Sequence, residues 1–149
     1  MATTFATGLA TSNQAFTPPG GGVVGIREAV YNFTAALVVD DIIQMIPVAP
    51  GERVVDLQLI VETDLDSSTG VVIDVGDGVD PDRYIDGTTV GQAGGFASLG
   101  SGIVTAAAAA ALNYNYTAND TIDVKIAVAP SGTPAASGSI RLRAFIVRG

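Results

Sequence analysis

The sequence predicts an all-β protein, an antiparallel β-sandwich of Ig-like or jelly-roll type with an extended N-terminal arm. Three observations favour this fold class. The 149 residues include 18 Val and 12 Ile but only 8 Leu, and branched Cβ atoms suit a pleated sheet better than a helix. The 18 Gly, 7 Pro and 14 Thr are typical of short strands joined by turns. Alternation of apolar and polar residues recurs in successive segments from residue 28 onward.

The N-terminal segment, residues 1–22, carries no charge and closes with the run Pro-Pro-Gly-Gly-Gly at 18–22. Such a composition cannot build a core and favours an extended arm followed by a hinge. Residues 23–149 then form a single sandwich domain, because about 150 residues make one domain. The arm is either a free terminus or a segment that lies on a neighbouring subunit. Its apolar anchors, which favour the second alternative, are Phe5, Leu9 and Phe16.

Four segments in the first half of the chain are predicted strands: Glu28–Val39, Ile42–Val48, Glu52–Glu62 and Val71–Val75. In the second of these, Pro47 indicates an edge position or a strand end, since proline cannot donate to a ladder. The side chains predicted to face inward are Ala29, Tyr31, Phe33, Ala35, Leu37 and Val39 in the first segment, and Val55, Leu57, Leu59 and Val61 in the third.

Two further segments near the C-terminus, Thr121–Ala129 and Ile140–Val147, alternate most regularly and are predicted to pair as a hairpin. Their predicted inward residues are Ile122, Val124, Ile126 and Val128, and Ile140, Leu142, Ala144 and Ile146. Before them lies the six-residue run Ala106–Ala111. We expect this run to be extended, because small side chains allow close packing under a neighbouring segment. One or two helical turns across the end of the sandwich are the alternative.

The absence of Cys and His excludes several classes of chemistry. Thiol nucleophiles, Ser–His–Asp relays, ordinary zinc sites and disulfide frameworks all need one of these residues. Carboxylate chemistry and oxygen-ligated metals remain, but no carboxylate pair is set apart and the aromatic platforms of a glycosidase are missing. We therefore expect a protein that is not an enzyme and needs no cofactor.

The net charge of −8, with a single Lys, argues against nucleic-acid binding and against anionic membranes. The N-terminus has no basic residue before Arg27, so no signal peptide is expected, and no apolar window reaches the length of a membrane span. Charge is uneven along the chain. Residues 62–86 carry eight acidic residues and one basic residue, whereas residues 87–149 carry two acidic and four basic ones.

The densest acidic segment is residues 74–87. Its Asp-Gly pairs at 77–78 and 86–87 and its Asp-Pro-Asp sequence are typical of tight turns, which is the interpretation we adopt. Calcium binding is the alternative, because oxygen ligands spaced two residues apart suit that ion. The pattern departs from the EF-hand. The candidate ligands are Asp77, Asp80, Asp82 and Asp86.

The last predicted strand places Arg141 and Arg143 on the face opposite its core residues, together with Phe145. Alternating arginines either protect a sheet face or edge from unwanted pairing or contact an acidic partner. Because Phe145 would be exposed on that face unless something covers it, we regard these three residues as a candidate interface.

Taken together, these elements resemble the small jelly-roll capsid decoration, or cement, proteins of tailed bacteriophages. The resemblance rests on the uncharged arm, the segment Val71–Gly87, Tyr114 and Tyr116 before a strand pair, and a chain that ends inside its last strand. It implies a jelly-roll sandwich that assembles as a homotrimer on the outer surface of the virion, made in the host cytoplasm. The implied partner is the major capsid protein, and the implied function is to stabilise the shell by bridging neighbouring capsid subunits.

The alternative is a receptor- or glycan-binding β-sandwich from a phage fibre or a bacterial surface. Such a module would present a loop cluster with aromatic and ligating side chains. The one segment that offers this is Asn113–Tyr116, with Asp120 nearby.

Overall fold

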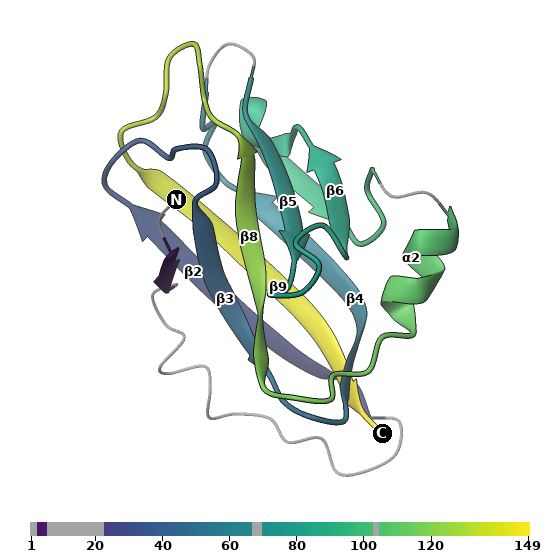
Figure 1. Ribbon diagram of the computed structural model, residues 1–149. Coiled ribbons are helices and arrows are strands. Elements are labelled where there is room, and N and C mark those ends of the chain that lie inside the picture. The colour runs from purple at the N-terminus through teal and green to yellow at the C-terminus, as the bar shows by residue number, and fades with distance from the viewer. Residues whose placement is uncertain (1–2, 6–22, 67–69, 103–104) are drawn as a thin grey trace.

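The computed structural model describes residues 3–5, 23–66, 70–102 and 105–149, and it has two layers of β-sheet packed face to face (Figure 1). A five-stranded sheet has the order β1-β3-β8-β5-β6, and a four-stranded sheet has the order β2-β9-β4-β7. The strands are β1 (Thr3–Phe5), β2 (Gly25–Phe33), β3 (Ile42–Val48), β4 (Glu52–Val61), β5 (Val72–Gly76), β6 (Ile85–Thr88), β7 (Gly95–Ser98), β8 (Asp120–Val128) and β9 (Gly138–Arg148); the helices are the 3-10 turn η1 (Val90–Gln92) and α2 (Thr105–Leu112).

The strand pairing is that of a jelly roll. β2 pairs with β9, β3 with β8, β4 with β7 and β5 with β6, all antiparallel. These pairs correspond to one long hairpin, β2–β5 against β6–β9, rolled up so that its strands alternate between two sheets. β4 also pairs with β9, and β5 with β8, which closes each layer. The prediction of an antiparallel sandwich is therefore confirmed, and its jelly-roll alternative describes the topology.

The core lies between the two sheets and follows the predicted alternation, with one shift. In β4 the residues Leu57, Leu59 and Val61 are buried as predicted, but Val54 is buried in place of Val55. A β-bulge between Val54 and Asp56 causes the shift, because the extra residue reverses which side chains point inward.

Three predictions about the strands are wrong. β8 and β9 are not a hairpin, because they lie in different sheets and the Pro130–Gly138 connection crosses between the layers. The first predicted strand ends at Phe33, so that Ala35 and Val39 are exposed. Val128 is 46% exposed, because β8 ends there.

The expectation of an extended alanine run is also wrong, because residues 105–112 form the helix α2. Alanine has the highest helix propensity, and the short helix gains support at its C-terminal end. The Asn113 side chain donates to the Ala109 carbonyl at 2.9 Å, and Ala111 is buried at 2% exposure. The helical alternative is therefore correct, but Figure 1 shows the helix at one side of the sandwich and not across its end. None of the described helices has the length and apolar character to cross a membrane.

Buried ion pairing and backbone capping fix the two ends of the sandwich. At one end Arg27 donates to both carboxylate oxygens of Glu52 at 2.7 and 2.6 Å, and to the Pro47 carbonyl at 2.7 Å. Burial raises the pKa of Glu52, but Arg27 and the Ala49 N–H outweigh it and hold that pKa below its usual value. At the other end the buried Asp66 carboxylate accepts the backbone N–H groups of residues 131–133.

Candidate interaction surface

The solvent-facing side of the four-stranded sheet, which we call the outer sheet face, collects the candidate interface residues. Cross-strand register places Glu28, Arg143 and Gln58 in one row, and Val30, Arg141, Ile60 and Phe96 in the next. A third row pairs Ile26 with Phe145. The outer sheet face therefore consists of Ile26, Glu28, Val30, Gln58, Ile60, Glu62, Phe96, Arg141, Arg143 and Phe145.

The arginines of this face are paired within the chain. Arg141 contacts Glu28 at 2.6 Å and Glu62 at 3.0 Å, and Arg143 contacts the second oxygen of Glu28 at 2.7 Å. Burial would raise the pKa of Glu28, but hydrogen bonds from Arg143 and then Arg141 hold it below its usual value. Hydrogen bonds to Glu28 and then to Glu62 raise the pKa of Arg141. The charges of Arg141 and Arg143 are thus balanced within the chain, which does not favour the alternative that these arginines contact an acidic partner.

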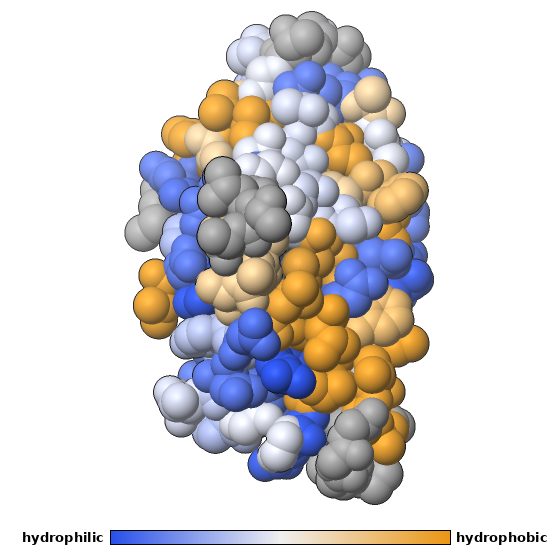
Figure 2. Space-filling model, turned by 90° about the vertical axis from the view of Figure 1, so that its right-hand side faces the viewer, coloured by the Kyte–Doolittle hydropathy of each residue, from blue (hydrophilic) through white to orange (hydrophobic). Residues whose placement is uncertain are grey.

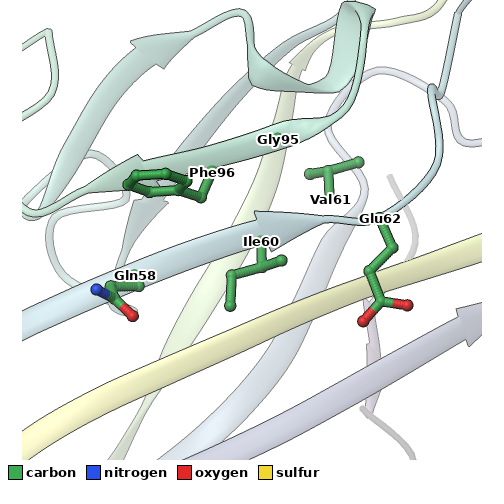
Figure 3. Close-up of a pocket in the computed structure, with 6 residues that line it drawn as sticks. All are labelled: Gln58, Ile60, Val61, Glu62, Gly95 and Phe96. Atoms are coloured by element: carbon green, nitrogen blue, oxygen red, sulfur yellow. The ribbon is translucent and has the colours of Figure 1, made fainter.

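Apolar side chains flank this charged centre on both sides. Phe96, on the short strand β7, is 68% exposed, and Ile26, on β2, is 57% exposed. Figure 3 shows Gln58, Ile60 and Glu62 pointing to the same side of β4, with the Phe96 ring beside them. Together they line a shallow pocket of roughly 550 Å³. Phe96 and Ile60 thus form a small apolar patch next to the polar side chains of Gln58 and Glu62, and such patches are typical of protein contact surfaces.

Another side of the molecule also exposes apolar residues. Figure 2 looks at the side that carries α2 and shows apolar residues gathered in a band in the lower half of that view, next to polar ones. Leu112, at the end of α2, is 38% exposed.

The structure brings together part of the predicted interface. Arg141, Arg143 and Phe145 lie on the outer sheet face as expected, and β9 is the centre of its sheet, so they protect no edge. Phe5 lies in β1, on the opposite sheet. The predicted anchors Leu9 and Phe16 lie outside the described residues.

Two important residues of this face were missed by the sequence reasoning. Glu28 lies on the polar side of the alternation in its segment, but nothing local indicates that two arginines more than 110 positions later bind it. Phe96 follows the glycine-rich stretch at 91–95, a composition typical of a turn rather than a strand. Its signal was the lone large apolar residue after Gly94 and Gly95, whose positive φ angles of 76° and 125° form the tight entry into β7.

The acidic segment forms a turn whose centre is the buried carboxylate of Asp77. One oxygen accepts the N–H groups of Val79 and Asp80 at 3.0 and 2.9 Å. The other accepts Arg83 Nε at 2.6 Å and the Tyr116 hydroxyl at 3.1 Å. The turn predicted at Asp77-Gly78 is therefore present, and Tyr116 ties it to the rest of the sandwich. The turn predicted at Asp86-Gly87 is wrong, because both residues lie in strand β6.

The calcium alternative gains no support from this geometry. Both carboxylate oxygens of Asp77 already accept hydrogen bonds from the donors just described. Asp82 and Asp86 are exposed. The pKa of Asp80 is raised, first by its hydrogen bond with Asp82 and then by burial. Across the described ranges no three acidic side chains converge in a way that could hold a metal ion.

The aromatic segment needed for the glycan-binding alternative is occupied within the chain. Tyr116 is 2% exposed, and its hydroxyl lies 2.7 Å from that of Tyr84. Burial raises the pKa of both hydroxyls far above the usual range of a tyrosine. The Arg83 guanidinium lies 3.6 Å from the centre of the Tyr114 ring and covers it. These rings hold the acidic turn in place and offer no open platform for a sugar.

Asp123, on β8, is a second buried carboxyl, beside Asp77. It is 6% exposed, lines a cavity of roughly 170 Å³ beside Asp77 and Pro81, and its Oδ1 has no hydrogen-bond partner within the described residues. Burial raises its pKa to about 6, and the negative charges of Asp120 and Asp77 add to the effect.

The variant Asp123→Asn is expected to raise the free energy of unfolding at pH 8 by about 1–3 kcal/mol. A carboxyl whose pKa is higher in the folded state stabilises the protein as the pH falls from about 7 towards 4, and costs stability above that range. Urea unfolding at pH 5 and pH 8 should therefore show a smaller pH dependence for the variant than for the natural protein. Asp64→Asn, an exposed position that does not line this cavity, is the control and should keep the natural dependence.

No protein-family model matches this sequence, and no curated protein matches it significantly. Solved structures do match. A chain from the capsid of Ralstonia phage GP4 has a TM-score of 0.71 at 23% identity, covering 99% of both chains. A chain from the Cyanophage Pam1 capsid asymmetric unit has a TM-score of 0.66 at 25% identity, covering 93% of this chain and 96% of that one.

A third match, to the acid-stable capsid of Helicobacter pylori bacteriophage KHP30, has a TM-score of 0.51 at 13% identity and covers 84% of this chain and 87% of the other. All three chains belong to phage capsids. The protein shares its fold with them over most of its length. The Cyanophage Pam1 match in particular supports a structural role in a phage virion.

Proposed function

We propose that this protein is a non-enzymatic capsid decoration protein that binds the outer surface of a phage capsid and stabilises it by bridging neighbouring subunits of the major capsid protein. The observation that carries the proposal is the agreement in fold and in length with two phage capsid chains. The match covers 99% of the Ralstonia phage chain and 96% of the Cyanophage Pam1 chain. Those capsid components are therefore about as small as this chain. A small sandwich suits a protein that is added to a shell.

The outer sheet face is the proposed contact with the capsid. Its charged centre is balanced internally, and Phe96 and Ile26 stand exposed on either side of it. The paired charged groups keep this face compatible with water in the free protein. The apolar side chains beside them still offer surface area that can be buried on binding. Exposed apolar residues of this size are the natural anchors of an interface.

The proposed unit on the capsid is a homotrimer. Each copy alone offers a small contact area, but three linked copies bind together with a high effective concentration. Light scattering on the purified protein tests this part of the proposal. A protein that stays monomeric at high concentration would contradict it, and would leave the capsid role to be judged by the binding experiment.

The capsid role is tested with capsids that lack this protein. We expect the purified protein to bind them and to raise the temperature at which they break open. Phe96→Asp, which puts a charge into the proposed contact, should weaken binding at least about tenfold, corresponding to about 1.4 kcal/mol.

Val79→Asp is the matched control, because Val79 is 78% exposed but lies on the acidic turn beside the other sheet. It should bind as the natural protein does. Equal binding by the Phe96 and Val79 variants would rule out the outer sheet face as the contact. If the natural protein binds no capsid but gives a signal on a glycan array, the receptor-binding alternative is correct.

A further inference from the structure

The first strand, β1, differs from the other strands of the described structure. It spans three residues, Thr3–Phe5, and pairs in parallel with Ile42–Gln44 of β3, whereas the other pairs between described strands are antiparallel. Parallel pairing is slightly weaker per residue, and three residues make a short ladder. Figure 1 shows β1 at the rim of the sandwich beside β3. β1 is thus an edge strand that is only weakly bound to its sheet.

The edge of β3 that β1 covers can accept a pairing strand at its N-terminal end but not at its C-terminal end. β3 contains no charged residue, and an uncharged apolar edge strand invites pairing with another chain. From residue 45 onward a β-bulge between Gln44 and Ile46 and the missing N–H of Pro47 block further pairing. The unprotected part is therefore Ile42–Gln44, which is the part that β1 occupies.

The chain between β1 and β2 is much longer than its path requires. The Arg27 side chain, on β2, bonds the Pro47 carbonyl, so β2 begins near the end of β3. From the level of Gln44 to that of Pro47, and across to the other sheet, the path is roughly 15–20 Å. Residues 6–24 could span about 60 Å when extended. This segment carries no charge, and its Pro-Pro-Gly-Gly-Gly run at 18–22 favours no compact structure.

We propose that β1 is exchanged between copies, so that residues 3–5 of one chain pair with Ile42–Gln44 of a neighbouring chain in the soluble oligomer. The backbone hydrogen bonds are the same within one chain or between two, so the exchange costs little pairing energy. The surplus length of residues 6–24 lets the strand reach the neighbour. This inference extends the proposed homotrimer and names the acceptor edge; it does not depend on the capsid contact.

Cysteine cross-linking tests the exchange, because the natural chain has no cysteine. Thr3 and Ile42 are register partners, so one chain carries Thr3→Cys and a second, co-expressed chain carries Ile42→Cys. After mild oxidation we expect at least about tenfold more mixed covalent dimer than when Thr3→Cys is combined with Phe96→Cys, which is exposed on β7 in the other sheet. Each chain expressed alone gives the background of symmetric dimers.

The double variant Thr3→Cys/Ile42→Cys in one chain gives the opposing measurement. Strand exchange predicts covalent multimers on a non-reducing gel. An internal disulfide in single chains, together with mixed dimers at the control level, would overturn the proposal. Light scattering separates this outcome from failure of the proposed function, because an oligomer without cross-links would retain the homotrimer and exclude only the exchange.

Discussion

Replacing Asp77 with alanine is expected to lower the free energy of unfolding by about 3–5 kcal/mol. The Asp77 side chain is fully buried and is the shared acceptor for Arg83, Tyr116 and two backbone N–H groups. Its loss leaves the mostly buried Arg83 guanidinium without its main counter-charge, and desolvated groups without partners are costly. Urea unfolding at pH 7, followed by circular dichroism, measures the loss.

Asp82→Ala is the matched control for this variant. Asp82 is exposed and belongs to the same acidic turn, so its removal should change the free energy of unfolding by less than about 0.5 kcal/mol. Equal stability of the two variants would mean that Asp77 is not the centre of the turn. The conservative variant Asp77→Asn keeps the volume and should fall between them.

Replacing Gly76 with alanine is expected to be nearly as damaging, with a loss of at least about 3 kcal/mol. A Cβ at this position would overlap the Asp80 carbonyl oxygen and the backbone of Pro81. Both groups belong to backbone that the Asp77 hydrogen bonds hold in place. The turn cannot give way without breaking those bonds, so the cost cannot be relieved by rotating a side chain. Thermal unfolding and the yield of soluble protein report the effect.

Gly78→Ala, two residues further on, distinguishes a steric effect from a general intolerance of the turn. There the nearest atom to an added Cβ is a carboxylate oxygen of Asp120, at 3.2 Å, which can move aside. We expect a change of less than about 1 kcal/mol. A loss as large as that of Gly76→Ala would show that packing against the Asp80 and Pro81 backbone is not the cause.

Much of the fold could be predicted because alternation of side chains is a local property. The pattern in Ile140–Val147 identified four buried residues of β9 correctly, since each strand of a sandwich has one face towards the core. It missed Val147, which the alternation puts on the opposite face but which is buried. The same local reasoning failed where one extra residue shifts the alternation of inward and outward side chains, as at the bulge after Val54. It failed also for the alanine run, where helix propensity outweighed the argument from small side chains.

The contacts between distant segments could not be read from the sequence. The pairing of β8 with β3 and of β9 with β2 depends on how the whole sandwich rolls up. Because β8 and β9 are neighbours in the sequence, the local pattern suggested instead that they pair with each other. Asp77 was identified as a turn residue, but its bond to Tyr116 joins positions 39 apart. The outer sheet face likewise depends on the placement of Phe96 opposite Ile60, which register in the folded sheet decides.

The central position of β9 has a consequence for how the protein folds. Both neighbours of this strand, β2 and β4, come much earlier in the chain, and the Glu28–Arg143 bond spans 115 positions. The middle of the four-stranded sheet is thus filled by the strand that follows all the others in sequence. Until β9 arrives, β2 and β4 have unpaired backbone on the sides that will face it. We therefore expect slow folding, in milliseconds to seconds, with a late step in which β9 inserts between them.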